Sequence, residues 1–398
     1  MKRILALTLI FALLLCGCGA KATESEQEQV SAQEMSAQAA EEETAAAETT
    51  AEPTTEPTTE PTTVPTEPPV IRNPLNGQII DEPFTGRVFA NTVSNLQENL
   101  PHVGVTQADV VMEMYANMNN VVRCLALYTD IESVAAIGST RSTRPIFNDI
   151  AQHYDLILSH AGGSDTALAD AANRGIENFN IDSWVVASTG ASYRDTEYKR
   201  AYENTLFGIG SGIKAYAESQ GYPMELEKDY GFRFTDDGTP ENGEAADKIS
   251  VQMIYGKAKK ETIMEYDAAT DKYVWNQYGK VMQDQITGEV EGFTNVIIMH
   301  TNITNNGIYH AADFTAGGTG YYANGGKIIP IVWSCADEDS AFTFMTNDAQ
   351  DLLLGAGNTY ICIVTPESPV TYEAAVPVET VSAETAPAET EPAQDVAG

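Results

Sequence analysis

Residues 145–164 have the sequence PIFNDIAQHYDLILSHAGGS, and this stretch decides the fold. The proline and the spacing of apolar residues predict a helix from Pro145 to His153. An apolar run from Leu156 to Ser159 predicts a short strand, and Gly162 and Gly163 then break the chain before a further helix. Such close alternation of helix and strand is typical of an α/β unit.

The flanking sequence extends this unit on both sides. Upstream, three apolar runs predict strands at Val110 to Met114, Val121 to Tyr128 and Ser133 to Gly138. Downstream, Ser164 is a suitable N-cap for a helix that ends near Gly175. Strands joined through a helix are expected to be parallel with a right-handed crossover, so we expect a mixed α/β domain.

The glycine-rich segment Gly208 to Gly212 precedes the last helix expected in this domain. That helix should run from Ile213 to Ser219, with Ser211 as its N-cap and Gly221 as its end. The glycines resemble a phosphate-binding loop, but they lack the Walker lysine and the dinucleotide-binding spacing. We therefore expect a glycine-rich helix entry here.

Beyond Tyr230 the pattern changes to short strands with little helix. The apolar runs that predict strands are Ile249 to Tyr255, Thr262 to Tyr266, Lys272 to Asn276, Asn295 to His300, Gly326 to Trp333, Phe342 to Met345 and Asn358 to Val364. Residues 267–271 are expected to form a hairpin turn. We place a boundary near Lys228, between an α/β domain at 71–228 and a β-rich domain at 229–366.

Residues 1–18 have the features of a bacterial lipoprotein signal peptide. A charged start precedes an apolar run from Ile4 to Leu15, and the small residue Gly17 precedes Cys18. An uncleaved transmembrane anchor is the alternative, but the run is well short of the roughly 20 residues that span a bilayer. We expect a palmitate-containing lipid on Cys18, rather than on Cys16, and a protein on the extracytoplasmic face of the membrane.

Two further segments, 19–70 and 367–398, cannot form a core. From Thr23 to Pro69 there is no aromatic residue, lysine or arginine, and Glu-Pro-Thr-Thr occurs three times between Glu52 and Thr63. Such sequence buries too little apolar surface to offset the entropy of ordering. We expect a disordered acidic Pro/Thr stalk and a disordered acidic tail.

The chain is strongly acidic, with a formal charge of −35. Lys2, Arg3 and Lys21 contribute +3, the acidic residues of the stalk −12 and those of the tail −7, so −19 remains for Ile71 to Pro366. A charge of this sign repels nucleic acid and anionic lipid surfaces, which excludes nucleic acid as an expected partner. A basic cluster within this acidic region is therefore informative.

Three cysteines remain after the lipid-modified one: Cys124, Cys335 and Cys362. Their number is odd, they lie in strand-like apolar sequence, and no spacing suggests a zinc or redox motif. We expect buried free thiols; the alternative is a Cys335–Cys362 bridge.

Two loops are the strongest candidates for a ligand site. One contains Arg141 and Arg144 and the other begins at His160, and each follows an expected strand, where ligands of open α/β sheets bind. The guanidinium groups of arginine and the backbone N–H groups at the start of a helix can both bind an anion. The residues expected to bind it are Arg123, Arg141, Arg144, His160, Gly162, Gly163 and Ser164. The alternative is that the arginines pair with Asp149 or Asp165.

Other chemistry has weaker support. His160 to Gly163 resembles the oxyanion loop of esterases, but the chain has no G-x-S-x-G motif, which disfavours a serine hydrolase. His300, His310 and Asp313 match no metal-site spacing, and we expect them to be separate strand and loop residues. We therefore expect no metal and no cofactor, except Mg²⁺ under the enzymatic alternative given below.

From about Asn73 to Pro366 the chain resembles the YerB-like lipoprotein family of Gram-positive bacteria. The stretches that carry the resemblance are Gln107 to Glu113, Arg123 to Tyr128, Gly138 to Phe147, Tyr154 to Ser164, Arg194-Asp195 and Trp333. The resemblance implies a domain of unknown function in N- and C-terminal parts, and it implies no established reaction.

The chain departs from the family pattern in two places. Family members usually have Pro-His-Asn-Leu-Tyr where this chain has residues 202–206, so Glu203 replaces the histidine and only Asn204 matches. Asn119-Asn120 stands where a glycine pair usually precedes the arginine matched by Arg123. Any reaction that needs this histidine is not expected here.

The order of motifs is also similar to that of the LytR-CpsA-Psr enzymes, which transfer glycopolymers from polyprenyl pyrophosphate lipids. No catalytic residue is carried over from that similarity. We expect a lipid-anchored envelope protein that binds an anionic ligand or a cell-wall partner. The alternative is a transferase or hydrolase of a polyprenyl pyrophosphate-type precursor, with Arg141 and Arg144 as a charge clamp; a structural spacer is a third interpretation.

Overall fold

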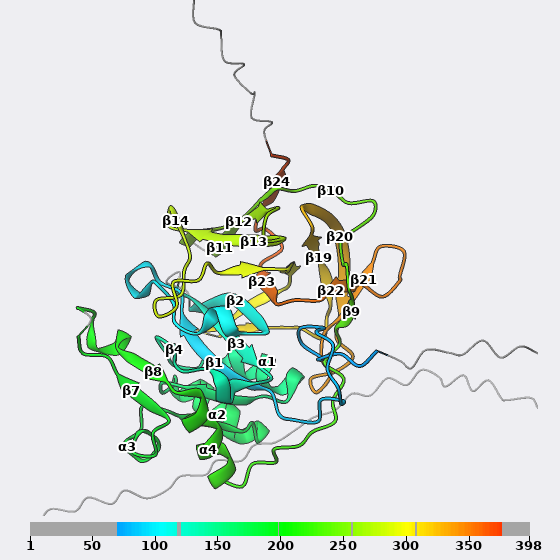
Figure 1. Cartoon of the computed structure of the whole chain (residues 1–398). Helices are drawn as coiled ribbons and strands as arrows, with labels where there is room; N and C mark the ends of the chain where they lie inside the picture. Colours follow the sequence, from blue (N-terminus) through cyan, green and yellow to red (C-terminus); the bar gives the residue numbers. More distant parts are fainter. Residues whose placement is uncertain (1–69, 118–120, 198, 256–257, 307–308, 376–398) are drawn as a thin grey trace, which may run out of the picture. The chain divides into compact units, whose positions relative to one another are not determined.

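The computed structural model describes residues 70–375 except 118–120, 198, 256–257 and 307–308 (Figure 1). The predicted signal peptide, Cys18, the stalk and most of the tail lie outside the described residues. The described residues belong to one folded unit that combines helices and strands before Lys228 with a strand-rich part after it. The expected fold class is therefore confirmed.

One sheet of thirteen described strands runs through the protein, in the order β10-β20-β19-β16-β23-β2-β3-β1-β5-β6 with β17, β18 and β21 beside it. Its strands before Lys228 are β1 Phe89–Ser94, β2 Val110–Asn117, β3 Val121–Tyr128, β5 Ile157–His160 and β6 Asn178–Asn180. Those after it are β10 Glu244–Ala245, β16 Asn295–His300, β17 Ile303–Asn306, β18 Tyr309–Ala312, β19 Gly318–Asn324, β20 Lys327–Ser334, β21 Thr343–Thr346 and β23 Thr359–Val364. Because β23 pairs in parallel with β2, the sheet crosses the boundary predicted near Lys228.

β5 (Ile157–His160) pairs in parallel, as predicted, but not with the strand expected before the first helix. Its neighbours are β1 and β6, both parallel to it. The strand predicted at Ser133 to Gly138 is wrong: the 3-10 turn η3 (Ile131–Ser133) precedes a two-residue strand, β4 (Ile137–Gly138), in a separate sheet with β7 (Ser192–Arg194) and β8 (Leu206–Gly208). Ile137 and Gly138 pair with β8, and the chain meets the main sheet only after them, where the Ser94 N–H of β1 donates to the Ser139 carbonyl at 2.9 Å.

The two helices around β5 form as expected. α1 spans Pro145–Tyr154 and α2 spans Asp165–Arg174. The Ser164 hydroxyl accepts a hydrogen bond from the Ala167 N–H at 3.1 Å and caps α2, while Gly175 ends it with a φ of 70°. Both caps satisfy backbone groups that a helix end leaves unpaired.

The later helices differ in one detail. α3 spans Trp184–Ala187 and α4 spans Gly210–Ser219, with Ile209 instead of Ser211 at its N-cap position. Gly210 packs so closely on the Ile131 carbonyl that a Cβ would lie 1.8 Å from its oxygen. Gly210 is therefore the first residue of α4, where it allows close packing on Ile131, and it is not part of a loop before the helix. The remaining 3-10 turns are η1 Gln97–Asn99, η2 Val105–Gln107 and η4 Tyr202–Asn204.

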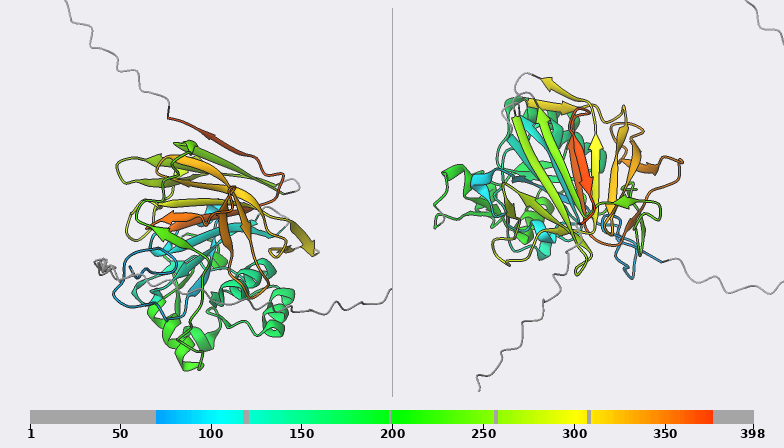
Figure 2. Two further views of the ribbon diagram at one scale, coloured as in Figure 1. Left: turned by 90° about the vertical axis from the view of Figure 1, so that its right-hand side faces the viewer. Right: turned by 90° about the horizontal axis from the view of Figure 1, so that it is seen from above.

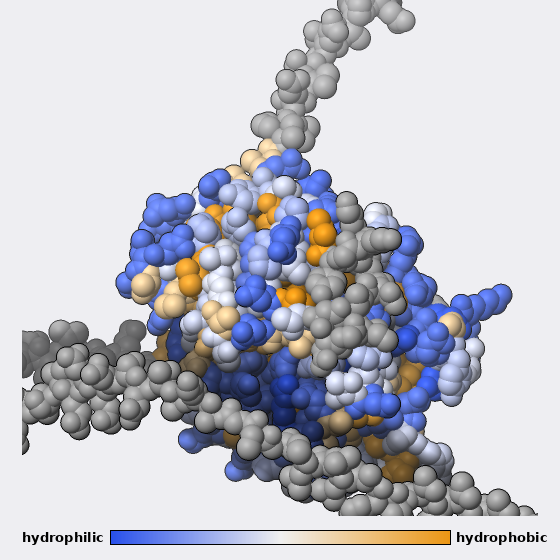
Figure 3. Space-filling view, turned by 180° about the vertical axis from the view of Figure 1, so that it is seen from behind, coloured by the Kyte–Doolittle hydropathy of each residue, from blue (hydrophilic) through white to orange (hydrophobic). Residues whose placement is uncertain are grey.

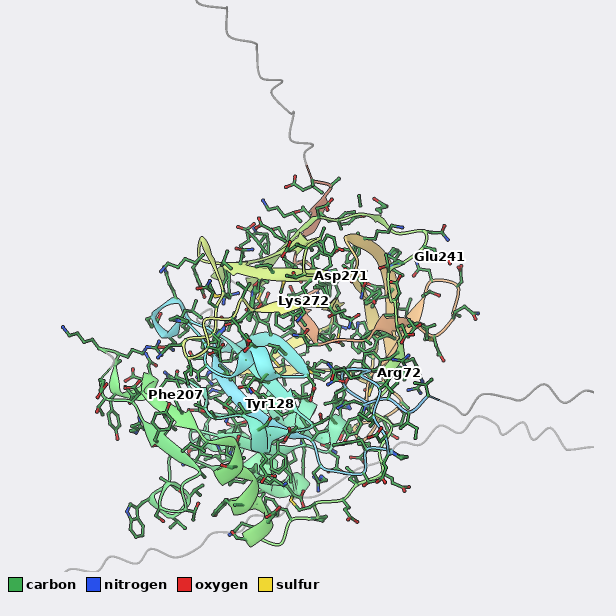
Figure 4. The ribbon with its side chains drawn as sticks, viewed as in Figure 1. Arg72, Tyr128, Phe207, Glu241, Asp271 and Lys272 are labelled. Atoms are coloured by element: carbon green, nitrogen blue, oxygen red, sulfur yellow. The ribbon has the colours of Figure 1, made fainter. Side chains whose placement is uncertain are left out.

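A second sheet packs near the first. Its strands are β11 Lys248–Tyr255, β12 Ala258–Asp267, β13 Lys272–Gln277, β14 Lys280–Val281, β15 Gly292–Phe293 and β24 Val370–Glu373. The turn predicted between β12 and β13 is present, with Asp271 in the left-handed region at φ 54°, next to Lys272 (Figure 4). Two more short strands, β9 Arg233–Thr235 and β22 Leu353–Gly355, pair in parallel.

Buried apolar side chains fill both faces of the main sheet. On one face, side chains of β2 and β3 such as Tyr115 and Cys124 share a core with Trp275 of the second sheet. On the other face, Leu125 and its neighbours pack against Phe147 and the rest of α1. The views in Figure 2 show these layers, and Figure 3 shows a mostly hydrophilic surface with a strongly hydrophilic recess.

The three described cysteines, Cys124, Cys335 and Cys362, are free and buried. The expectation of buried free thiols is therefore confirmed, and the alternative Cys335–Cys362 bridge is not formed.

Candidate anion-binding site

The two predicted loops lie side by side, one along the C-terminal half of β1 and the other beyond the end of β5. The Ala161 N–H donates to the Arg141 carbonyl, and the Thr143 N–H donates to the Gly162 carbonyl, each at 2.9 Å. The Arg141 N–H in turn donates to the Thr92 carbonyl of β1 at 2.9 Å. The loops therefore meet as expected, although β1 rather than the predicted strand is the neighbour that aligns them.

Three arginines, Arg123, Arg141 and Arg144, form what we call the arginine cluster. Arg123 projects from β3 on the α1 side of the sheet, and only 4% of it is exposed. Its Nη1 donates to the Ser142 carbonyl at 2.6 Å, so the loop that carries the other two arginines lies directly on it. Arg141 and Arg144 are half-buried.

The partners of the arginine cluster are uncharged. Arg141 donates to the Asn204 amide oxygen and to the Glu203 carbonyl, the latter at 3.3 Å. Arg144 donates to the Thr143 carbonyl at 2.6 Å, and its guanidinium lies 4.7 Å from the centre of the Tyr309 ring. Among the described residues, the ion pairs of the protein include none with these three arginines.

The structural alternative for Arg141 and Arg144 is therefore not observed. Asp149 instead pairs with Arg174, whose Nη2 lies 2.7 Å from the carboxylate. Asp165 forms no ion pair with either arginine in the described part of the chain. Within the described residues, the positive charge of the cluster has no fixed counter-charge in contact with it.

The electrostatics of the cluster follow from this arrangement. Burial lowers the pKa of Arg123 well below its usual value, and repulsion from Arg144 and Arg141 lowers it further. Burial also lowers the pKa of Arg144 and of Arg141. In the case of Arg141, the charges of Glu203 and Glu98 oppose this shift. Each guanidinium is thus less stable as a cation here than in water.

The start of α1 adds to the positive potential. Arg144 is the N-cap residue and no side chain caps this end. Pro145 has no N–H and the Phe147 N–H donates to the Arg144 carbonyl at 2.9 Å, so the contribution is that of the helix dipole. The Nε atom of Arg144 is buried without a hydrogen-bond partner among the described residues. Helix N-termini and buried donors both favour an anion.

The second predicted loop uses its polar groups within the protein. The Gly162 N–H donates to the Asn180 side chain at 2.9 Å, and the Ser164 hydroxyl caps α2. Gly163 packs against Leu168, and a Cβ there would lie 2.8 Å from that side chain. Gly162 and Ser164 therefore support the loop, and their role as ligands stays a prediction.

His160 lies at the end of β5. Its Nε2 is 3.0 Å from the Asn178 amide oxygen, and the ring also interacts with the Gly162 backbone. Burial lowers the pKa of His160, which keeps the ring neutral near pH 7. This histidine does not add a charge to the site.

Sequence reasoning missed two contacts of the cluster. Asn204 in η4 is the position that matches the family motif, and it accepts from Arg141. Tyr309 of β18 lies next to Arg144 although 165 positions separate them in sequence. The motif match was the signal for Asn204, whereas no local pattern marks Tyr309.

The other candidate residues do not assemble a site. In the described part of the chain, no group of three or more His, Cys, Asp or Glu side chains is arranged to hold a metal ion. His300 contacts the Ser368 carbonyl at 3.3 Å, and His310 is buried in β18. None of the described helices has the length and apolar content needed to cross a membrane.

A pocket of about 710 Å³ contains Cys335, whose Sγ lies 3.3 Å from His153 Nδ1. The same Nδ1 lies 2.9 Å from the Ser340 carbonyl and so carries the proton. Burial raises the pKa of the Cys335 thiol and lowers the pKa of His153. This pair therefore does not supply the thiolate that a cysteine nucleophile needs.

Comparison with known proteins agrees with the resemblance seen in the sequence. Residues 75–223 match the N-terminal domain, and residues 250–361 the C-terminal domain, of the protein family of unknown function DUF3048. The crystal structure of YerB from Bacillus subtilis is similar, with a TM-score of 0.65 and 21% identity over 76% of this chain and 99% of that one. A comparison with curated proteins found no match. The chain therefore belongs to the YerB-like family of unknown function defined by these two domains.

Proposed function

We propose that this protein is a lipid-anchored protein of the cell envelope that binds an anionic ligand, or an anionic envelope partner, at the arginine cluster. The observation that carries the proposal is the burial of Arg123 beside Arg141 and Arg144, with no described carboxylate in contact. An anion between the three guanidinium groups would neutralise charge that the described residues leave unpaired.

The energetics favour a ligand over a purely structural role. Desolvating an ion costs several kcal/mol even after relaxation, and nearby like charges add to this cost. A structural arginine usually recovers that cost from a carboxylate, as Arg174 does from Asp149 and Asp170. Among the described residues, the acceptors of the three arginines are neutral, so a bound anion would supply the missing stabilisation.

The location in the envelope rests on the sequence features of the N-terminus. A charged start, an apolar run and Gly17 before Cys18 support lipidation at Cys18 and a position on the extracytoplasmic face. The acidic composition of residues 71–366 supports a partner other than nucleic acid. An anionic component of the cell wall is consistent both with the extracytoplasmic position and with a partner other than nucleic acid.

Binding of inorganic phosphate and pyrophosphate, measured by calorimetry, tests the proposal. Replacing Arg141 and Arg144 by glutamine should lower affinity about tenfold or more per site, because each charge-assisted hydrogen bond contributes about 1.5–3 kcal/mol. Arg174→Gln is the control, since Arg174 lies on the neighbouring helix, is exposed and is paired with acids. The proposal fails if the wild type binds neither anion, or if the double variant melts far below the wild type.

The enzymatic alternative is a transferase or hydrolase that acts on a polyprenyl pyrophosphate-type precursor. It is favoured by the paired forks of Arg141 and Arg144, which match the geometry of phosphate oxygens. Mg²⁺ would be the expected cofactor, and the contribution of the described residues would be this charge clamp. Release of phosphate or product from such a lipid would support the alternative, and saturable binding without turnover would exclude it.

A further inference from the structure

The arginine cluster constrains the charge of its ligand. Its three positive charges are held together by neutral contacts among the described residues. Glu98 and Glu203 act on Arg141 through their charge, but both are exposed, so water and salt screen them. A ligand with one negative charge would leave most of the cluster's charge unbalanced.

The depth of Arg123 constrains the shape of the ligand. Arg123 is almost fully buried, whereas Arg141 and Arg144 reach the surface. A group that contacts all three must therefore enter by a narrow, charged end. A terminal phosphoryl group offers three free oxygens, whereas a phosphodiester offers two and carries a substituent on each side. Arginine forks bind pairs of such oxygens.

We infer that the arginine cluster binds the terminal phosphoryl group of a phosphomonoester or pyrophosphate, in preference to a phosphodiester or a singly charged anion. This inference rests on the proposed anion-binding function and specifies the chemical class of the ligand. A lipid phosphate and a sugar phosphate share this terminal group, so the two sources must be compared directly.

Three small anions separate charge from shape in calorimetric titrations of the full chain. At about pH 7.5 and low salt, methyl phosphate is mainly a dianion because its second pKa is near 6. Methyl sulfate has nearly the same shape with one charge, and dimethyl phosphate has one charge and no terminal group. Methyl phosphate should bind at least about tenfold more tightly than either of the others. Its second negative charge strengthens the same contacts relative to methyl sulfate, and its third free oxygen adds a charge-assisted contact relative to dimethyl phosphate.

Two substituted monoesters identify the source of the ligand. Glucose 1-phosphate represents a polar source and geranyl phosphate a lipid source. One of them should bind at least as tightly as methyl phosphate, and the tighter of the two identifies the source. If both of them, and pyrophosphate as well, bind more weakly than methyl phosphate, neither ligand class fits and the inference is wrong.

Variants locate the preference in the cluster. Arg144→Gln should reduce the affinity for methyl phosphate more than that for methyl sulfate, and Arg174→Gln should leave both unchanged. Equal affinities of the wild type for the three small anions would overturn the inference while leaving the proposed anion-binding function intact. No binding of any of them, or of pyrophosphate, would overturn both.

Discussion

Lys260 Nζ lies 2.6 Å from Glu113 Oε1, and both side chains are almost completely buried between the two sheets. Glu113 belongs to β2 and Lys260 to β12, so this ion pair joins the α/β part to the strand-rich part. The carboxylate also accepts hydrogen bonds from Asn95, Thr262 and Tyr360. Because its oxygens are satisfied from several strands, the pair fixes how the sheets pack.

Removing one partner of this pair should be strongly destabilising. Lys260→Met leaves the Glu113 carboxylate buried without its cation, which typically costs about 3–5 kcal/mol of unfolding free energy. Glu113→Gln should have a similar effect, and the double variant Glu113→Gln/Lys260→Met should lose less than the sum of the two. Urea unfolding curves measure these changes. Single variants within about 1 kcal/mol of wild type would show that the pair does not stabilise the sheet packing.

Local sequence signals predicted the helices but not the central pairing of the sheet. Pro145, Ser164 and Gly175 mark helix ends through their own conformations and caps, so α1 and α2 could be located from sequence. β1 is fully buried, but it contains the polar residues Asn91 and Thr92, so its sequence did not predict a buried strand. The Asn91 side chain is satisfied by Ser159 at 2.8 Å, a contact that depends on the fold and not on the local sequence.

The candidate site, like the fold, could be predicted from sequence only where local patterns mark it. Arg141 and Arg144 follow a recognisable change from strand to helix, so their proximity to the His160 loop could be expected. Tyr309 joins them only because β18 lies against α1 and the end of β2. Contacts of this kind depend on long-range pairing and leave no local pattern.

Asp149 should make stability depend on pH. Burial raises the pKa of this carboxyl to about 6, although Arg174 opposes the shift. The folded protein therefore binds the proton more tightly than the unfolded chain, where the pKa is about 3.9. The contribution of Asp149 to stability is greatest below about pH 4 and falls as the pH rises to 6 and above, by at most about 1.4 kcal/mol per pKa unit.

The variant Asp149→Asn should remove this dependence. Its unfolding free energy, measured by chemical denaturation between about pH 4 and pH 7, should change less with pH than that of the wild type, and the difference should follow a single titration near the raised pKa. Parallel profiles for the two proteins would show that Asp149 is not protonated in this range.

Cys335 should be the thiol that reagents reach in the folded protein. It lines a surface pocket, whereas Cys124 and Cys362 have no exposed surface. Its raised pKa should keep the reaction with iodoacetamide slow near neutral pH and accelerate it as the pH rises. Mass spectrometry of labelled peptides should therefore find Cys335 modified first. Equal labelling of all three would indicate that the sheet opens readily.

Lipidation should depend on Cys18 and not on Cys16, because only Cys18 follows the small residue Gly17. Cells that express the protein with a palmitate analogue should label the wild type and Cys16→Ser, and they should not label Cys18→Ser. The unlabelled variant should also leave the membrane fraction. Label retained by Cys18→Ser would exclude the proposed anchor.

Glu203 should weaken the binding of anions at the arginine cluster. Its charge acts on Arg141, and it is exposed beside Asn204, so it repels an approaching phosphate. Glu203→Gln should therefore raise the affinity for pyrophosphate about two- to fivefold, the range of an exposed charge interaction, and added salt should shrink the gain. Glu197→Gln is the matched control, since this exposed residue of the same loop does not act on Arg141. Weaker pyrophosphate binding by Glu203→Gln than by the control, in calorimetry at low salt, would show that Glu203 assists the ligand and that the cluster does not act as a simple cation site.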